Sequence, residues 1–214
     1  MKHPITQTMK KHYAKTFKEY GCTSEGVDWG KHEDRALVRH QNIGKLISKR
    51  PSSILDVGCG YGAFLDFLGH DNIEFTGIDV VPEMISSGRA RHPGAEFICD
   101  DFLQHDFSGQ NFDYVVCNGI FTQKLHVSEN AMEAYTRQVI SKMFEISTVG
   151  IAFNMMTSYV NFKAENLYYS NPSTTLSWVM NNITQNVELN HAYPLYEYVV
   201  IAYHDNVIKS LQGG

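Results

Sequence analysis

The sequence predicts a single α/β domain in which one mostly parallel sheet lies between two layers of helices. The first observation is that short apolar runs alternate with helical patterns from residue 52 onwards. The second is that each run is rich in β-branched or aromatic residues and ends in Gly, Asp or Asn, as buried parallel strands do. Right-handed crossovers between such strands place the helices on both faces of the sheet.

The predicted elements follow one another in a regular order. Five apolar runs are predicted as the parallel strands, at 52–58, 74–80, 95–101, 112–118 and 148–154. Helical patterns lie at 61–69, 82–92, 129–146 and in a segment that begins at Asn171, its predicted N-cap. Two more apolar runs, 186–192 and 197–203, are separated by four residues, and so short a connection requires an antiparallel hairpin.

Two predicted helices, 6–20 and 31–50, precede the sheet and are joined by a Gly-rich linker. They have no place in the sheet, so residues 1–50 are predicted to form a helical cap or lid over the site. Residues 51–214 then form the α/β domain, for which the chain is long enough to bury one core.

Composition narrows the class of partner. A net charge of -5 and a pI near 6.0 give no basic surface of the kind that binds nucleic acid, so nucleic acid is not expected as a partner.

The four cysteines occur singly, which predicts that the protein lies in a reducing cytoplasm. No apolar run is long enough to span a membrane, the N-terminus lacks the pattern of a signal peptide, and the scattered histidines predict no metal site. The sequence makes no prediction of the oligomeric state.

The strongest local signal is a glycine loop that follows the first predicted strand. Asp56 precedes Gly58, Gly60 and Gly62, and glycine at these positions lets the backbone turn sharply and approach a ligand closely. Asp79 ends the next strand, seventeen residues after Gly62. A carboxylate there can accept hydrogen bonds from both hydroxyls of a ribose; the alternative is an Asp that caps the following helix.

Two further signals end the third and fourth predicted strands. The third strand ends in Asp100-Asp101-Phe102 and the fourth in Asn118-Gly119. The carboxyl ends of parallel strands are where open α/β sheets bind their ligands, so all four signals are predicted to meet at one edge.

These motifs, in this order, resemble those of the class I (Rossmann-like) S-adenosylmethionine (SAM)-dependent methyltransferases, whose first motif is D/E-x-G-x-G-x-G. The resemblance covers about residues 50 to 155. It implies SAM as the cofactor and a seven-stranded sheet with the strand order 3-2-1-4-5-7-6. The implied cofactor-binding residues are Asp56, Gly58, Cys59, Gly60 and Gly62 in the loop that holds the methionine part, Asp79 for the ribose, Asp101 and Phe102 for the adenine, and Asn118 and Gly119 beside the sulfonium. Val80 and Met84 are also predicted to bind the cofactor. Asp100 is the alternative to Asp101.

The chain departs from the methyltransferases of nucleic-acid bases, which carry D/N/S-P-P-Y/F where this chain has Asn118-Gly119-Ile120-Phe121. Both prolines are missing, so a small-molecule acceptor, such as a metabolite or a sugar, is predicted in place of a flipped base. Methyl transfer would then occur by direct in-line displacement.

The acceptor side offers weaker signals. His191 is predicted as a catalytic base and Asn154 as an acceptor-binding residue, because both follow strands that end at the same edge as the glycine loop; the alternatives are a structural His and a turn residue. Candidate contacts in the cap are Tyr13, Tyr20, Trp29 and Arg39, and Arg39 would suit a carboxylate. The seven tyrosines between 157 and 203, together with Trp178, are predicted either to line a pocket or to fill strand faces.

Three other functions remain open from the sequence. SAM itself could be the substrate, cyclised or cleaved with release of methylthioadenosine. The chain could be a SAM-binding module without turnover. It could also be a nicotinamide oxidoreductase, although the spacing G-x-G-x-G differs from the G-x-G-x-x-G of that class.

Overall fold

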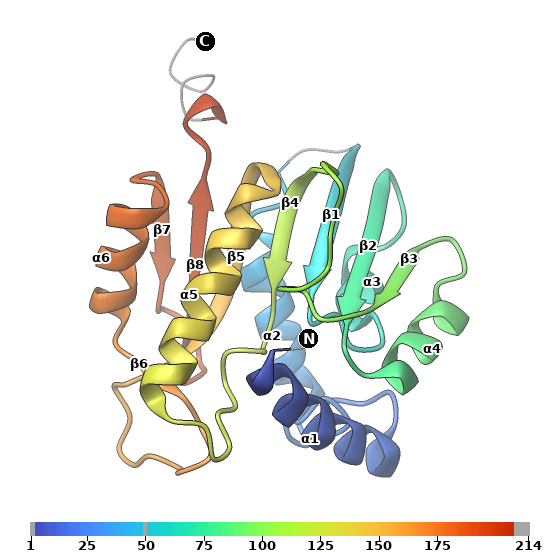
Figure 1. Ribbon diagram of the computed structural model, residues 1–214, viewed down its shortest axis with the longest axis horizontal. Helices are drawn as coiled ribbons and strands as arrows, with labels where there is room; N and C mark the ends of the chain where they lie inside the picture. The colour runs from blue at the N-terminus through green and yellow to red at the C-terminus, as the bar shows by residue number, and fades with distance from the viewer. Residues whose placement is uncertain (1–2, 49–50, 208–214) are drawn as a thin grey trace.

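The computed structural model describes residues 3–48 and 51–207. One sheet forms the centre of the molecule (Figure 1), with the strand order β3-β2-β1-β4-β5-β8-β7 and a short β6 beside β5. The strands are β1 (Ser52–Val57), β2 (Ile73–Asp79), β3 (Glu96–Cys99), β4 (Phe112–Cys117), β5 (Ser147–Thr157), β6 (Tyr169–Ser170), β7 (Val187–Asn190) and β8 (Glu197–Tyr203). The helices are α1 (Pro4–Tyr20), α2 (Glu33–Gly44), α3 (Ala63–Leu68), α4 (Pro82–Arg91), α5 (Glu129–Glu145) and α6 (Pro172–Asn182).

The predicted topology is confirmed apart from one added strand. Strands β1 to β5 pair in parallel, while β8 is antiparallel to both β5 and β7, as the short connection between the last two strands requires. The count of seven strands was wrong, because β6 pairs with Met156 and Thr157 at the end of β5. A strand of two residues is too short to show periodicity in the sequence.

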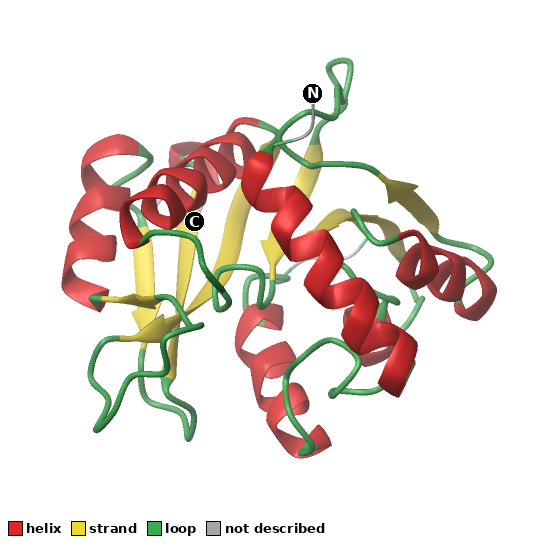
Figure 2. Cartoon of the chain, turned by 60° about the horizontal axis from the view of Figure 1, so that its bottom comes forward, coloured by secondary structure: helices red, strands yellow, loops and turns green. Residues whose placement is uncertain are grey.

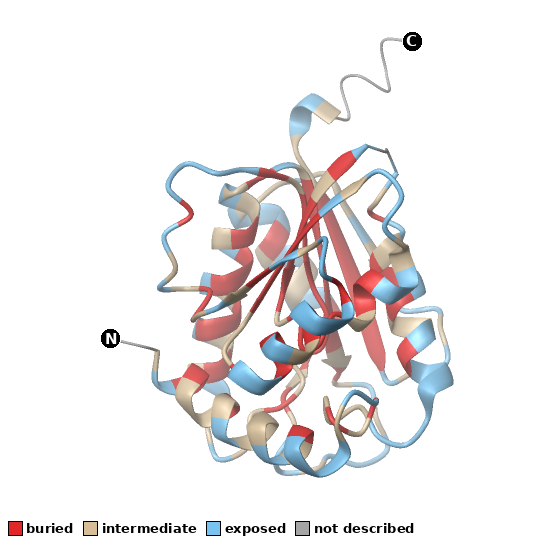
Figure 3. Cartoon of the chain, turned by 90° about the vertical axis from the view of Figure 1, so that its right-hand side faces the viewer, coloured by how far each residue is buried: buried red, intermediate tan, exposed pale blue. Residues whose placement is uncertain are grey.

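Both faces of the sheet are buried, which explains the nearly continuous apolar runs of the strands (Figure 3). Leu55, Val115 and Cys117 pack with α5 and α6 on one face. Ile54 and Tyr114 point the other way, to a second cluster with residues of α2, α3 and α4. Successive side chains of a strand alternate between faces, so one strand supplies both cores.

Helix limits follow local signals. The Asn171 side chain accepts hydrogen bonds from the backbone N–H groups of Ser173 and Thr174, so the predicted N-cap of α6 is confirmed. The second helix was predicted to run to residue 50, but α2 ends at Gly44, and the last two residues of that prediction lie outside the described part of the chain. Glycine at this point favours helix termination.

The N-terminal helices lie at the carboxyl edge of the strands. α1 crosses the ends of the central strands (Figure 1), and Figure 2 brings this edge forward with α1 across it. α1 contacts α4, and α2 packs against α3, β5 and β8. None of the helices in the described ranges is long and apolar enough to cross a membrane. All four cysteines are free thiols, and the reducing compartment stays a prediction.

Candidate active site

The glycine loop between β1 and α3 has the backbone that glycine favours. Gly58, Gly60 and Gly62 have φ angles of +75°, +56° and +88°. A Cβ on Gly58 would lie 2.2 Å from Cγ2 of Ile120, so no other residue fits there without displacing the Ile120 side chain. The backbone N–H of Gly58 donates to the carbonyl of Ile78 at 2.8 Å, which ties the loop to the end of β2.

Asp79 ends β2 and points toward this loop. Its Oδ2 accepts a hydrogen bond from the Gly60 N–H at 3.0 Å, and its Oδ1 accepts one from the Val81 N–H at 2.9 Å. Burial raises the pKa of Asp79, while the backbone donors of Val81 and Gly60 oppose that shift. The carboxylate is therefore fixed beside the glycine loop by two backbone N–H groups.

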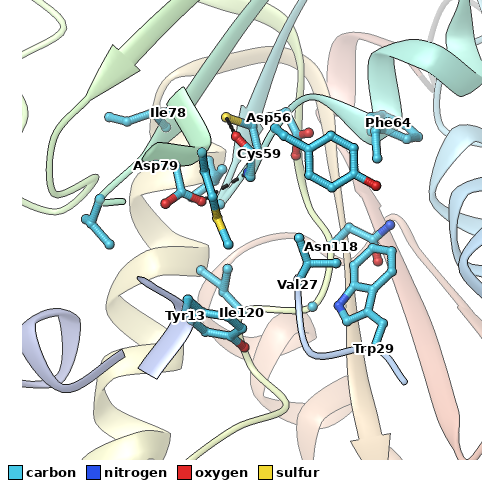
Figure 4. A pocket seen from close by; sticks show the side chains of 18 of the residues that line it. Tyr13, Val27, Trp29, Asp56, Cys59, Phe64, Ile78, Asp79, Asn118 and Ile120 are labelled. Atoms are coloured by element: carbon cyan, nitrogen blue, oxygen red, sulfur yellow. Dashed lines mark hydrogen bonds between the residues drawn. The ribbon is translucent and has the colours of Figure 1, made fainter. Parts of the chain in front are cut away.

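A cavity of about 500 Å³ brings the predicted residues together (Figure 4). Of the twelve predicted cofactor residues, all but Gly62 line it. Gly62 instead precedes the first residue of α3, and a Cβ there would lie 2.9 Å from the ring of His92. Ile78 and Asp79 lie on one side of the cavity, and Trp29 and Phe64 on the other. The size is that of a site for a small ligand.

Both aspartates that follow β3, Asp100 and Asp101, line the cavity. Asp101 is 1% exposed; its Oδ2 accepts from the backbone N–H of His3 at 2.8 Å and its Oδ1 from that of Leu103 at 3.1 Å. Asp100 also lines the cavity, so the choice between the two stays open. Asp101 thus joins the start of α1 to the end of β3.

His40 lines the cavity and was missed by the sequence analysis. Its Nδ1 lies 3.1 Å from Nδ2 of Asn118, and its ring is 5.5 Å from those of Trp29 and Phe64. Burial, with a smaller contribution from Arg39, lowers the pKa of His40 to about 4, so the ring is neutral at neutral pH. No local pattern marks His40, because its contact with Asn118 spans 78 positions of the chain.

Asn154 is buried in β5 and does not line the cavity. Its Oδ1 accepts from the Gly119 N–H at 2.7 Å, and its Nδ2 donates to Glu197 at 2.7 Å. Glu197 in turn accepts from Nε and Nη2 of Arg39, so the guanidinium of Arg39 is held by a carboxylate of β8. This network connects α2, β5 and β8 to the turn after β4.

The remaining acceptor-side candidates separate into two groups. Tyr13 and Trp29 line the cavity, whereas Tyr20 does not. His191 is exposed; its ring centroid lies 6.3 Å from that of Tyr159, outside the cavity lining. None of the seven tyrosines between 157 and 203 lines the cavity, and neither does Trp178. Within residues 3–48 and 51–207 no cluster of His, Cys, Asp and Glu could hold a metal ion.

Asp56 makes stability dependent on pH. Burial, together with the carboxylate of Asp79, raises the pKa of Asp56 from 3.8 to about 8. The folded state therefore keeps a proton that the unfolded chain releases, and the free energy of unfolding should fall as pH rises from about 4 to about 8, by up to about 1.4 kcal/mol per pH unit. We expect Asp56→Asn to flatten this decline in urea unfolding followed across that range.

A matched control is Glu74→Gln, which neutralises an exposed carboxylate on β2. This variant should keep the pH profile of the unmodified protein. An undiminished decline in Asp56→Asn would show that another group causes it.

Taken together, a glycine loop and an acidic residue at the ends of adjacent parallel strands define a Rossmann-like cofactor-binding protein. Residues 54–143 match a family model described as a methyltransferase domain. A Mycobacterium tuberculosis protein, Rv1506c, whose own methyltransferase designation is provisional, is 34% identical over 158 residues, which are 71% of this chain and 92% of the relative.

Two solved structures share the fold over nearly the whole chain. Magnesium protoporphyrin IX methyltransferase (ChlM) of Synechocystis PCC 6803 with bound SAM has a TM-score of 0.67 at 12% identity, covering 95% of this chain and 98% of that one. A complex of DhpI with S-adenosylhomocysteine (SAH) has a TM-score of 0.66 at 15% identity, covering 96% and 100%. The chain belongs to the class I SAM-dependent methyltransferases, and the resemblance found in the sequence is confirmed.

Proposed function

We propose that the protein transfers a methyl group from SAM to a small-molecule acceptor by direct in-line displacement. The observation that carries this proposal is that Asp79 and the glycine loop line one cavity, with Asp79 Oδ2 3.0 Å from the Gly60 N–H. SAM, when bound, supplies a methyl group that is already activated. The protein must therefore align an acceptor with that group and exclude water.

The polar groups of the cavity fit such a ligand. Oδ1 of Asp56 and Oδ1 of Asn118 are buried without a hydrogen-bond partner in the described structure, so both have acceptor capacity left for a ligand. Asp79 would accept from the ribose hydroxyls. Each carboxylate oxygen of Asp101 accepts one backbone hydrogen bond, from His3 or Leu103. A remaining lone pair would accept a hydrogen bond from the adenine amino group.

The two predicted catalytic residues, Asn154 and His191, differ in whether they could contact the acceptor or only position other groups. Asn154 would act through Gly119, whose N–H it holds, and thereby fix the turn that carries Asn118. This supports a positioning role, and direct contact of Asn154 with the acceptor stays a prediction. His191 also stays a prediction, and we route no proton through it, because it lies outside the cavity lining.

A small acceptor suits the charge of the chain and the size of the cavity. A net charge of -5 leaves little to neutralise a nucleic-acid backbone, and about 500 Å³ is the size range of small-ligand sites. The turn at Asn118-Gly119 also lacks the prolines of base methyltransferases.

The test uses the purified full chain. Calorimetry with SAH measures cofactor binding, and incubation with SAM and a metabolite extract should give SAH together with a new methylated mass. Methylthioadenosine from SAM alone would instead make SAM the substrate. SAH binding without any product across broad acceptor pools would indicate a binding module, and tighter binding of NADH than of SAH would contradict the proposal altogether.

A further inference from the structure

The cavity extends beyond the predicted cofactor residues to an aromatic end between α2 and α3. His40, Phe64 and Phe67 form a continuous set of rings there: the centroids of Phe64 and Phe67 are 6.0 Å apart at an angle of 19°, and those of His40 and Phe67 are 5.9 Å apart at 25°. Leu37 and Phe67 line the cavity and are still 47% and 37% exposed. Exposed apolar side chains at the rim of a cavity indicate an entrance for an apolar ligand.

The charges around the cavity have mostly one sign. Six carboxyl groups line it, namely those of Glu33, Asp56, Asp66, Asp79, Asp100 and Asp101, and burial keeps that of Asp56 neutral. Among the described lining residues the only Lys or Arg is Arg91, whose Nε donates to both oxygens of Asp66 at 2.9 and 2.8 Å. Arg39, which the sequence suggested for a carboxylate ligand, is held by Glu197. An anionic acceptor would therefore meet repulsion from the cavity wall, with no unpaired Lys or Arg among the described lining residues to offset it.

The same carboxylates already accept hydrogen bonds from the protein. Glu33 accepts from the backbone N–H and the hydroxyl of Ser24 at 2.8 and 2.7 Å, and Asp79 accepts from two backbone N–H groups. Asp56 has an unpartnered oxygen, but its raised pKa of about 8 keeps it protonated at neutral pH. A hydroxyl acceptor, which must lose a proton during attack, finds no free base among these groups.

The aromatic and phenolic side chains do not supply a base either. The pKa of His40 is lowered to about 4 by burial and Arg39. Burial raises the pKa of Tyr61 to about 12, and it also raises that of Tyr13. An amine in its neutral form needs no base, because its nitrogen carries a free lone pair.

On the basis of the proposed function, we propose that the acceptor is an amine attached to a flat apolar group, which enters between α2 and α3 past Leu37 and Phe67. The carboxylate of Glu33, whose partners at Ser24 are uncharged, attracts the ammonium form, and the amine loses its proton to bulk water before attack. The nitrogen lone pair then forms the bond to the methyl carbon, the bond from that carbon to sulfur breaks, and its electron pair stays on sulfur. The product leaves as the protonated methylated amine, so charge and atoms balance.

The experiment compares three probes that share one ring system: tryptamine, tryptophol and indole-3-acetate. Each is titrated into the SAH-bound protein in a calorimeter. We expect tryptamine to bind at least about tenfold more tightly than indole-3-acetate, with tryptophol between them. Equal or tighter binding of indole-3-acetate overturns the proposal, and so does the absence of binding by all three probes. Failure of SAH itself to bind would instead refute the proposed function, so the two failures are distinguishable.

A pair of variants tests the entrance. Leu37→Lys places a cation at the rim, and Gln41→Lys places the same charge on an exposed position of α2 that does not line the cavity. We expect Leu37→Lys to reduce the ratio of tryptamine affinity to indole-3-acetate affinity at least about fivefold. Gln41→Lys should leave the ratio unchanged. An equal effect of both variants, or no effect of Leu37→Lys, contradicts entry between α2 and α3.

Discussion

Asp79→Ala is expected to weaken SAH binding at least about 100-fold. The variant removes the proposed acceptor for two ribose hydroxyls, and hydrogen bonds to a charged group contribute about 1.5 to 3 kcal/mol each. It also leaves the N–H groups of Gly60 and Val81 without their partner, so the glycine loop loses one of its hydrogen bonds to β2. Calorimetry with SAH measures the effect directly.

Two further variants separate binding from folding. Asp79→Asn keeps the shape and one oxygen acceptor, so it should bind SAH with an affinity between those of the unmodified protein and Asp79→Ala. Glu74→Gln, at the exposed beginning of the same strand, should bind normally. If Asp79→Ala is folded by circular dichroism and binds SAH within threefold of the unmodified protein, Asp79 does not hold the ribose.

Glu197→Ala is expected to destabilise the fold by about 3 to 5 kcal/mol. Glu197 is 4% exposed and accepts hydrogen bonds from Arg39 of α2 and from Asn154 of β5. Removing one partner of a buried ion pair leaves the other charge uncompensated, which costs more than the pair itself contributes. Urea unfolding of the unmodified and variant proteins gives the difference in free energy.

The exposed pair Arg137 and Glu133 on α5 supplies the control. Its two side chains are 41% and 43% exposed, so Glu133→Ala should cost no more than about 0.5 kcal/mol. The double variant Arg39→Met with Glu197→Leu removes both charges and should recover much of the loss. Equal costs for Glu197→Ala and Glu133→Ala would show that the buried pair lacks the role assigned to it.

The predicted parts of the fold are those with local signals. Strands β1, β2, β4 and β5 are largely buried apolar runs, so their positions were visible in the sequence, although β5 continues to Thr157, beyond its predicted end at Asn154. Ser128 caps α5 by accepting from the Ala131 N–H, and that helix begins at the predicted residue. The glycine loop and Asp79 were also predictable, because their residue types follow from backbone geometry and ligand chemistry at fixed spacing.

The unpredicted parts depend on contacts between distant segments. Arg39 and Glu197 are 158 positions apart, and nothing in either neighbourhood shows that Glu197 would occupy the guanidinium. The sequence of α2 shows which of its residues share a face of the helix. Only the packed structure shows that the face with His40 contacts Asn118. The sequence also left open whether Asp100 or Asp101 faces the ligand. Both line the same cavity, so the choice between them stays open.

The hydrogen bond from the His3 backbone to Asp101 connects the segment just before α1 to the residue proposed to bind the adenine. Clipping of the chain just after His3 would remove that donor from a carboxylate that is otherwise almost sealed from solvent. Fusion partners attached ahead of this point would have to leave the same backbone N–H in place. Measured cofactor affinities would then depend on how the amino terminus was prepared, even when every residue of the sheet is intact.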